Sequence, residues 1–458
     1  MSKKLKLTVG VGLALLGIAW GTVGQFSDYL VGNRTIFSSA PACDDADACT
    51  ELSELFIVDA HSDTLMHRNP FEHSRDGHID AGRLAEGGVD LQVFAVASVA
   101  PKILQRDDGP CGDIDEGDRL KTYFLLKEPL NPSTWTSAMA RVDHMVALFE
   151  EGLGETSEGR SVQRIRTLSD LETLRDASAG ENLLGALLSI EGAYWASENQ
   201  EALLAQMDGL DAAGVRMIGL THRSSNQLAG FNEDCDDKHG LTEIGEFLVR
   251  DIWRRGMILD LAHASSKTLA DVAALSKSGA GGQVIVSHTG VRRACPIDRN
   301  LTDEDVRNVA RMGGVISLGF WTTVNCFDGS VSANEAREAI AKSFAITLEI
   351  LSEPEFVTEM GTSYEPMRHI GLGSDFDGAT LVPSGAEAIP WYLEGISGFQ
   401  KNGLQPFDRE AIENIAGENL FRLLTDSLNE RRNRERDPFR WNIGACGNGA
   451  FSENATHP

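Results

Sequence analysis

Residues 56–63 read FIVDAHSD, in which the short apolar run FIVDAH (56–61) ends at a histidine. The polar residues Ser62 and Asp63 follow it. Such a run suits a strand of a parallel sheet, which is buried on both faces. Seven further runs of this kind follow, with helical stretches between them: VDLQVFAVAS (89–98), LLGALLSIEG (183–192), VRMIGLTH (215–222), MILDLAH (257–263), QVIVSH (283–288), GVISLGF (314–320) and HIGLGSD (369–375). Eight strands alternating with helices predict an α/β fold, a closed (β/α)8 TIM barrel. The alternative is an open doubly wound sheet, but no Gly-x-Gly-x-x-Gly turn follows a strand to support it.

Six of the eight runs carry an ionisable residue at or just after their end. In a barrel the carboxyl ends of the strands meet at one face, where active sites lie. Any one of these residues taken alone is more often structural or on the surface. Their shared position on most strands predicts a site built from His61 with Asp63, Glu191, His222, His263, His288 and Asp375.

The pair His61 and Asp63 points to a metal ion. Residues i and i+2 of a strand lie on the same side, so an imidazole nitrogen and a carboxylate oxygen can bind one ion together. These ligand types suit Zn²⁺ and its borderline neighbours. A hydrogen-bonded pair in the core is the alternative for these two residues in isolation.

A second metal ion is expected beside the first. His263 and His288 end neighbouring strands, and the two oxygens of Glu191 could bridge both ions. A bridged pair about 3.5–4 Å apart shares a water and lowers its pKa towards neutrality. Asp375, after the last strand, is placed to take a proton from that water and pass it to a leaving amine.

The composition limits the partners. Lys plus Arg is 41 and Asp plus Glu is 68, which gives a formal net charge of −27. Binding of nucleic acid through its phosphates needs basic patches, so such binding is not expected. The hydrophobic share of 42% is ordinary for a globular protein with a full core.

The first 30 residues predict a membrane anchor. Lys3, Lys4 and Lys6 precede an uncharged run from Leu7 to Ser27, and a bilayer core needs about 20 apolar residues. The basic start should remain cytoplasmic, so the rest of the chain would be exported. A cleaved signal peptide and a buried core helix are the alternatives; the missing small-x-small cleavage site favours an uncleaved anchor.

The remainder divides into a polar stalk (31–54), a catalytic barrel (55–431) and a polar tail (432–458). Within the barrel, residues 99–182 form a long insertion of helical and loop character. A helix is predicted over Ala333–Leu351, and a closing helix over 408–431.

Nine short motifs in order resemble the membrane dipeptidase family, the renal-dipeptidase-like metallopeptidases (peptidase family M19) of the amidohydrolase superfamily. The resemblance spans roughly residues 55–425. Its motifs are DAHSD (59–63), GHIDAGRLAEGGVDLQVFA (77–95), SIEG (189–192), LTH (220–222), DLAHAS (260–265), SHTG (287–290), DRNLTDE (298–304), GSDFDG (373–378) and NIAGENLFRLL (414–424).

The resemblance implies two zinc ions per chain. His61 and Asp63 would hold one ion, His263 and His288 the other, and Glu191 would bridge them. Many relatives in the superfamily bridge their metals with a modified lysine, but no lysine ends a strand here.

The resemblance also implies roles towards substrate. His222 would stabilise the developing oxyanion, and Arg299 would bind the terminal carboxylate, a task suited to its bidentate guanidinium. Without the resemblance, Arg299 reads as a surface ion pair. Asp375 is the expected acid–base; Asp377, two residues later, is the alternative.

Seven cysteines fit an exported protein, in which some should form disulfides. Cys295 and Cys326 match a bridge of the family, so the resemblance predicts that they pair. Cys43 and Cys49 could close a small loop in the stalk, and Cys111 and Cys235 could pair near the site. Ser224 stands where animal members carry a bridging cysteine, so that bridge is missing.

The resulting hypothesis is a zinc-dependent metallo-exopeptidase that hydrolyses dipeptides with a metal-bridging hydroxide in the periplasm or outside the cell. A homodimer agrees with the resemblance, although no interface is readable. The first alternative is a related amidohydrolase that cuts N-acyl amino acids or lactams with the same metal site. The second is an anchored binding protein that has lost its chemistry.

Overall fold

The structure, a computed structural model, describes residues 34–74, 77–98, 131–156, 159–177, 182–233, 239–378, 380–399 and 407–436. The anchor predicted over residues 1–30 lies outside these ranges, as do Cys111, Cys235, Cys446 and residues 437–458 of the predicted tail. Within the described part of the chain, no helix has the length and apolar character that crossing a bilayer demands.

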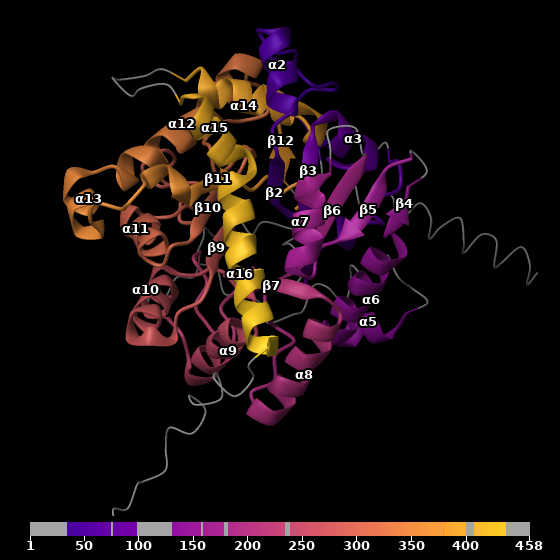
Figure 1. Ribbon diagram of the computed structural model, residues 1–458, viewed down its shortest axis with the longest axis vertical. Coiled ribbons are helices and arrows are strands. Elements are labelled where there is room, and N and C mark those ends of the chain that lie inside the picture. Colours follow the sequence, from indigo (N-terminus) through magenta and orange to yellow (C-terminus); the bar gives the residue numbers. More distant parts are fainter. Residues whose placement is uncertain are drawn as a thin grey trace, which may run out of the picture.

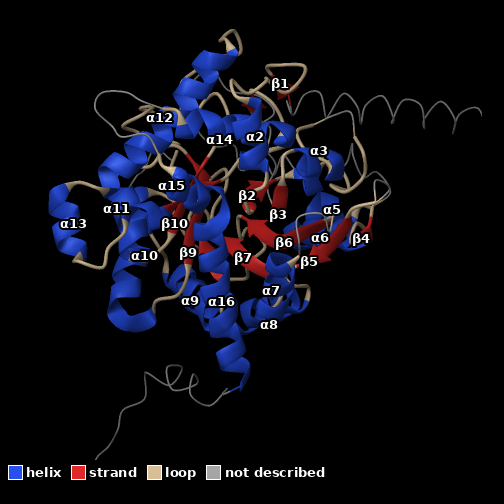
Figure 2. Cartoon of the chain, turned by 45° about the horizontal axis from the view of Figure 1, so that its top comes forward, coloured by secondary structure: helices blue, strands red, loops and turns tan. Residues whose placement is uncertain are grey.

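Eight parallel strands form a closed barrel, which confirms the predicted fold. Neighbouring strands pair in the order β3-β2-β11-β10-β9-β8-β7-β6, and pairing of β3 with β6 closes the ring. Figure 2 shows these strands enclosed by helices. The barrel strands are β2 (Ile57–Ser62), β3 (Val89–Ala97), β6 (Leu183–Glu191), β7 (Val215–Gly219), β8 (Ile258–Asp260), β9 (Val284–Thr289), β10 (Val315–Leu318) and β11 (Ile370–Leu372).

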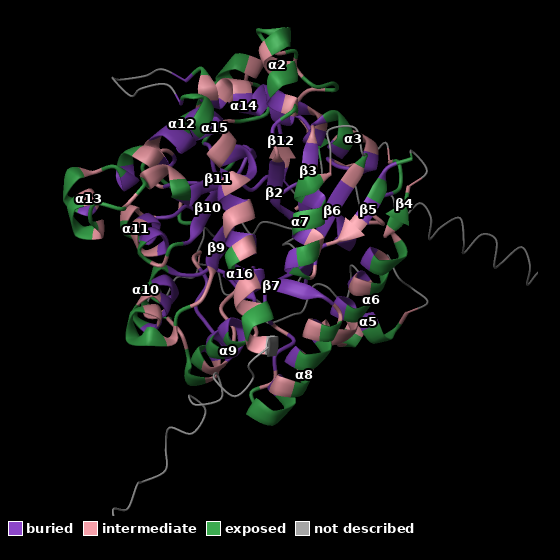
Figure 3. Ribbon diagram, in the orientation of Figure 1, coloured by how far each residue is buried: buried purple, intermediate pink, exposed green. Residues whose placement is uncertain are grey.

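Burial explains why these runs are almost continuously apolar. Nearly every residue of the eight strands is buried, because the barrel interior covers one face of each strand and helices cover the other (Figure 3). Strands with both faces buried lose the alternation of polar and apolar residues. The continuous runs therefore predicted the parallel arrangement correctly.

The helices lie outside and across the ring of strands. The helix predicted over 333–351 is confirmed with the same bounds. Figure 1 locates the larger helices, and the α-helices of the described residues are α2 (Ala46–Ser53), α3 (Ala81–Glu86), α5 (Ser133–Thr136), α6 (Ala138–Glu151), α7 (Leu168–Asp176), α8 (Gln200–Ala212), α9 (Glu243–Arg254), α10 (Ser266–Leu275), α11 (Asp303–Arg311), α12 (Ala333–Leu351), α13 (Pro354–Met360), α14 (Ile389–Ser397), α15 (Arg409–Glu413) and α16 (Asn419–Arg436).

One apolar cluster fills the barrel interior. Residues from seven of the eight strands meet in it, together with leucines of α7 and with Leu420, Leu423, Leu424 and Leu428 of α16. Residues that alternate with these along the same strands, such as Ile57, Leu259 and Ile316, belong to a second cluster shared with the surrounding helices, so the two clusters lie on opposite faces of the strands. The cluster thus forms a packed floor beneath the strand ends.

Helix α16 closes the end of the barrel at which the strands begin. The Asn419 side chain donates to the carbonyl of Ile370 at the start of β11, and Gln283, just before β9, donates to Glu430. Phe421 packs edge-on against Phe56, which precedes β2. This leaves the opposite end, where the strands finish, for a functional site. The helix also continues to Arg436, past the predicted end at residue 431.

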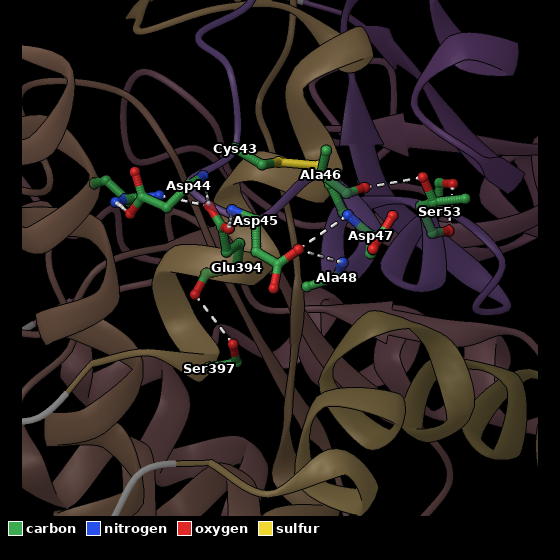
Figure 4. The surroundings of a disulfide bond; sticks show 12 residues. Cys43, Asp44, Asp45, Ala46, Asp47, Ala48, Ser53, Glu394 and Ser397 are labelled. Carbon is green, nitrogen blue, oxygen red and sulfur yellow. Dashed lines mark hydrogen bonds and ion pairs between the residues drawn. A yellow bond between two sulfur atoms is a disulfide. The ribbon is translucent and has the colours of Figure 1, made fainter.

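Residues 34–53 contact the barrel, although composition assigned them to a stalk. Strand β1 (Arg34–Thr35) pairs with β12 (Leu381–Val382), and α2 packs on α14. The predicted Cys43–Cys49 disulfide is present (Figure 4). Beside it, Glu394 of α14 accepts the backbone N–H groups of Asp44 and Asp45 at 3.0 and 2.9 Å. The domain boundaries themselves stay a prediction.

The insertion after β3 contains strands as well as the helices expected there. Its described part holds α5, α6 and α7 and the strands β4 (Gly154–Glu155) and β5 (Ser161–Arg164). Strand β5 runs parallel to the first residues of β6 and so extends the sheet beyond the ring. The predicted Cys295–Cys326 disulfide is also present and joins the segments after β9 and β10.

Candidate metal centre

The residues predicted from the strand ends converge at one point. His61 lies in β2, with Asp63 directly after that strand, Glu191 ends β6, and His288 lies in β9. His222, His263 and Asp375 follow β7, β8 and β11 by three residues each. All are buried. They meet because the strands that carry them form one closed ring. The structure thus brings together Asp63, His61, Glu191, His222, His263, His288 and Asp375.

Glu191 occupies the middle of this group. Its Oε1 atom lies 3.0 Å from His263 Nε2, 3.5 Å from His288 Nε2 and 3.7 Å from His61 Nε2. Its Oε2 atom lies 3.4 Å from His222 Nδ1. One carboxylate therefore faces four imidazoles, as a bridging ligand would.

Several buried polar atoms here are compatible with a bound cation. His61 Nε2, Asp63 Oδ1 and Glu191 Oε2 have no hydrogen-bond partner among the described residues. The Nε2 atoms of His263 and His288 lie only 2.9 Å apart. Buried polar atoms ordinarily have partners, and imidazole and carboxylate groups are the donors that Zn²⁺ prefers. The residues therefore fit the predicted metal.

Three sets of side chains have ligand atoms within 4.8 Å of one another. One is His61, Asp63 and Glu191, the set predicted for the first ion. The second is Glu191, His222 and His263, and the third is His61, His288 and Asp375. His222 and Asp375 thus lie as close to the centre as the predicted ligands do. How the residues divide between two ions stays a prediction.

The charges in this group are poorly solvated. Burial, reinforced by the charge of Asp63, raises the pKa of Glu191 well above its usual range. Burial lowers the pKa of His61, but the neighbouring Asp63, Glu191 and Asp375 carboxylates outweigh this and raise it to about 10. A bound cation would relieve the repulsion among these carboxylates.

In the other two predicted histidine ligands, the pKa is lowered rather than raised. Burial, with the positive charge of Arg299, lowers the pKa of His263 well below its usual range. Burial, with the charges of His61 and Arg299, does the same for His288. Neutral imidazoles keep a lone pair for a metal ion, so both residues are suited to the role of ligand.

Asp375 and Asp377 have different surroundings. The Asp375 Oδ1 atom lies 3.9 Å from His61 Nε2, and burial raises the pKa of Asp375 to about 7. Asp377 instead accepts hydrogen bonds from Thr64 Oγ1 at 2.8 Å, Arg68 at 2.9 Å and the His78 backbone at 2.7 Å. Asp375 therefore faces the centre, and Asp377 supports the loop.

The backbone is unusual at the same place. Four described non-glycine residues have positive φ, and three of them lie here: His263 at 63°, Asp375 at 57° and Asp377 at 62°. Such conformations cost about 1–3 kcal/mol each and persist where surrounding contacts enforce them.

Arg299 is buried beside the centre rather than paired on the surface. Its guanidinium donates to the carbonyl of His288 at 3.0 Å and lies 3.3 Å from His263 Nε2. Burial lowers its pKa despite the charge of Asp375. An arginine in this position can meet an anionic group that approaches the centre.

Sequence reasoning missed the residues beneath and beside the ligands. Ser287 and Asp260 stand inside the SHTG and DLAHAS motifs but were given no role. Tyr194 was also missed: its hydroxyl accepts backbone N–H groups of His222, Arg223 and Ser224 at 3.0–3.2 Å and so orients the segment after β7. Strand alternation would have turned Ser287 away from its neighbour His288, and nothing local marks Tyr194, so the sequence offered no signal for either residue.

The sequence of this chain is similar to those of known proteins. The sequence model of the family described as membrane dipeptidase (peptidase family M19) matches residues 47–436. Dipeptidase aclJ of Aspergillus oryzae is 29% identical over 245 residues, which are 53% of this chain and 51% of that protein. The chain thus matches about half the length of this curated relative.

Solved structures share the fold. The crystal structure of dipeptidase AC, an M19 metallopeptidase, has a TM-score of 0.60 and 22% identity, over 82% of this chain and 99% of that one. A metallopeptidase from Rhodobacter sphaeroides, liganded with a phosphinate mimic of the dipeptide L-Ala-D-Ala, has a TM-score of 0.59 and 21% identity, with the same coverage.

Proposed function

The chain belongs to the membrane dipeptidase family, and from this premise we propose that it is a binuclear zinc dipeptidase. The observation that carries the proposal is the position of Glu191, whose two oxygens face His61, His222, His263 and His288 within 3.7 Å. His61 and Asp63 would hold one ion, His263 and His288 the other, and Glu191 both. When bound, the ions supply Lewis acidity that activates water and polarises the scissile carbonyl.

The other residues of the site bind substrate and move a proton. Hydrolysis adds OH to the carbonyl carbon of the peptide bond and H to the departing amine. Asp375 delivers that proton, and its raised pKa of about 7 suits a group that must both accept and release one. Arg299 binds the carboxylate of the second residue, and His222 stabilises the negative charge on the carbonyl oxygen.

A dipeptide panel tests the function. We expect the full chain with zinc to release free amino acids from dipeptides, and a chelator to stop the release. Matched N-acetylated dipeptides separate a dipeptidase from an enzyme that cuts N-acyl amino acids, because only the former requires a free amine. Release that persists after complete removal of metal would contradict the proposal.

We also propose that the catalytic domain is exported and anchored by residues 1–30. The two disulfides support this location, because such bonds persist in oxidising compartments. Cell fractionation with protease accessibility tests it: the barrel should be digested in spheroplasts while a cytoplasmic marker stays intact. The homodimer stays a prediction.

A further inference from the structure

The hydroxyl of Ser287 lies directly behind two of the proposed metal ligands. Ser287 Oγ is 3.0 Å from Nδ1 of His288 and 3.3 Å from Nδ1 of His61. The two imidazole rings lie against each other, with centroids 3.9 Å apart. Both rings thus turn their Nδ1 atoms towards one oxygen, and their Nε2 atoms towards Glu191.

The proton of this hydroxyl points away from the rings. Ser287 Oγ donates to Oδ2 of Asp260 at 2.6 Å, and a carboxylate only accepts hydrogen bonds. A hydroxyl has one proton and two lone pairs. With the proton given to Asp260, both lone pairs remain, so Ser287 can only accept from His61 and His288.

The orientation of Asp260 is itself fixed. Its Oδ1 atom accepts the backbone N–H groups of Ala262 and Ser287, each at 3.0 Å. Asp260 and Ser287 are 4% and 0% exposed, so water does not compete for these bonds. The carboxylate therefore presents Oδ2 to the serine and cannot turn away.

We propose that Ser287, held by Asp260, is a positioning residue that keeps His61 and His288 protonated on Nδ1. When a bound cation offsets the charge of the neighbouring carboxylates, Nε2 of each ring is then unprotonated and directed to the metal centre. A histidine ligand is usually fixed through its other nitrogen in this manner, and loss of the fixing group lowers metal affinity by roughly 10–100-fold. This inference rests on the metal site of the proposed function.

The Asp260→Asn variant should reverse the direction of the hydrogen bond between residue 260 and Ser287. The amide oxygen would face the two backbone N–H groups, so the NH₂ group would face Ser287. The serine would then accept from the amide and donate its proton to one imidazole, which would have to carry its own proton on Nε2. That proton occupies the position needed by the metal, in a side chain of nearly unchanged size.

The test is Zn²⁺ affinity, measured on the metal-free full chain by competition with a chromophoric chelator. We expect Ser287→Ala and Asp260→Asn each to weaken Zn²⁺ binding by roughly 10–100-fold. Ser317→Ala is the matched control: Ser317, on neighbouring strand β10, is equally buried, and its hydroxyl has no hydrogen-bond partner among the described residues. It should bind Zn²⁺ as the parent does.

Two results would overturn the inference. One is Zn²⁺ affinity within twofold of the parent in Asp260→Asn, whose fold is checked by circular dichroism. The other is an equal loss of affinity in Ser317→Ala, which would mean that any change in the barrel interior disturbs the centre. A parent protein that binds no Zn²⁺ would instead contradict the proposed function, so the two failures are distinguishable.

Discussion

At the scale of single residues, the site shows how burial assigns different tasks to similar side chains. Asp375 and Asp377 are two positions apart, both are buried, and both have left-handed backbone. Burial raises the pKa of each, but in Asp377 the charges of Arg68 and His78 outweigh it and lower the pKa overall. A carboxylate held ionised by a permanent partner anchors a loop, whereas one without such a partner can exchange a proton.

Substitution of the two aspartates should separate these tasks. We expect Asp375→Asn to lower kcat by roughly 10²–10⁴-fold while the unfolding free energy stays close to that of the parent. Asp377→Asn should instead cost about 3 kcal/mol of stability, because it leaves Arg68 without its anionic partner. Dipeptide hydrolysis and urea unfolding measure the two effects. Loss of kcat in Asp377→Asn at unchanged stability would contradict this division.

At the scale of strands and helices, the part that repeats was predictable and the part that depends on distant contacts was not. The eight barrel strands and α12 follow from apolar runs and helical periodicity. Strand β5 (SVQR) has no such apolar run, so its sequence does not predict a strand. It pairs with the first residues of β6, a contact between distant parts of the chain. The roles of Ser287 and Asp260 likewise depend on the register of β8 with β9, which the sequence does not display.

His369, at the start of β11, should make stability depend on pH. Its Nδ1 atom lies 2.8 Å from the carbonyl of Gly314, and burial, with Arg422 and Arg368 nearby, lowers its pKa from 6.5 to about 4. As the pH falls below about 6.5, the unfolded chain therefore binds a proton on His369 that the folded protein does not bind. Stability from this source is complete above pH 6.5 and falls by about 3 kcal/mol as the pH drops towards 4.

The His369→Asn variant tests this, because its amide can still donate to Gly314 but does not titrate. The difference in unfolding free energy between parent and variant should change by about 3 kcal/mol between pH 7 and pH 4. A constant difference between parent and His369→Asn would show that His369 has the same pKa in the folded and the unfolded state.

At the scale of the whole molecule, the barrel separates stability from chemistry. The interior cluster and α16 hold the end where the strands begin, while the opposite end gathers the carboxylates of Asp63, Glu191 and Asp375 within reach of His61. Carboxylates buried together repel one another, so this end is destabilising without a cation. A metal ion that binds only the folded chain should therefore stabilise the entire barrel.

Removal of metal should lower the unfolding temperature of the full chain. Zn²⁺ at about a thousandfold its Kd adds about 4 kcal/mol, and for a domain of this size that corresponds to a Tm higher by roughly 5 °C. Scanning calorimetry before and after chelation, with zinc content measured in parallel, gives the shift. Added Zn²⁺ should restore the Tm, whereas Mg²⁺, which prefers oxygen ligands, should not. Because the predicted ligands span the barrel from β2 to β9, the transition should move as a single unit; an unchanged Tm in fully zinc-free protein would show that the centre contributes nothing to folding stability.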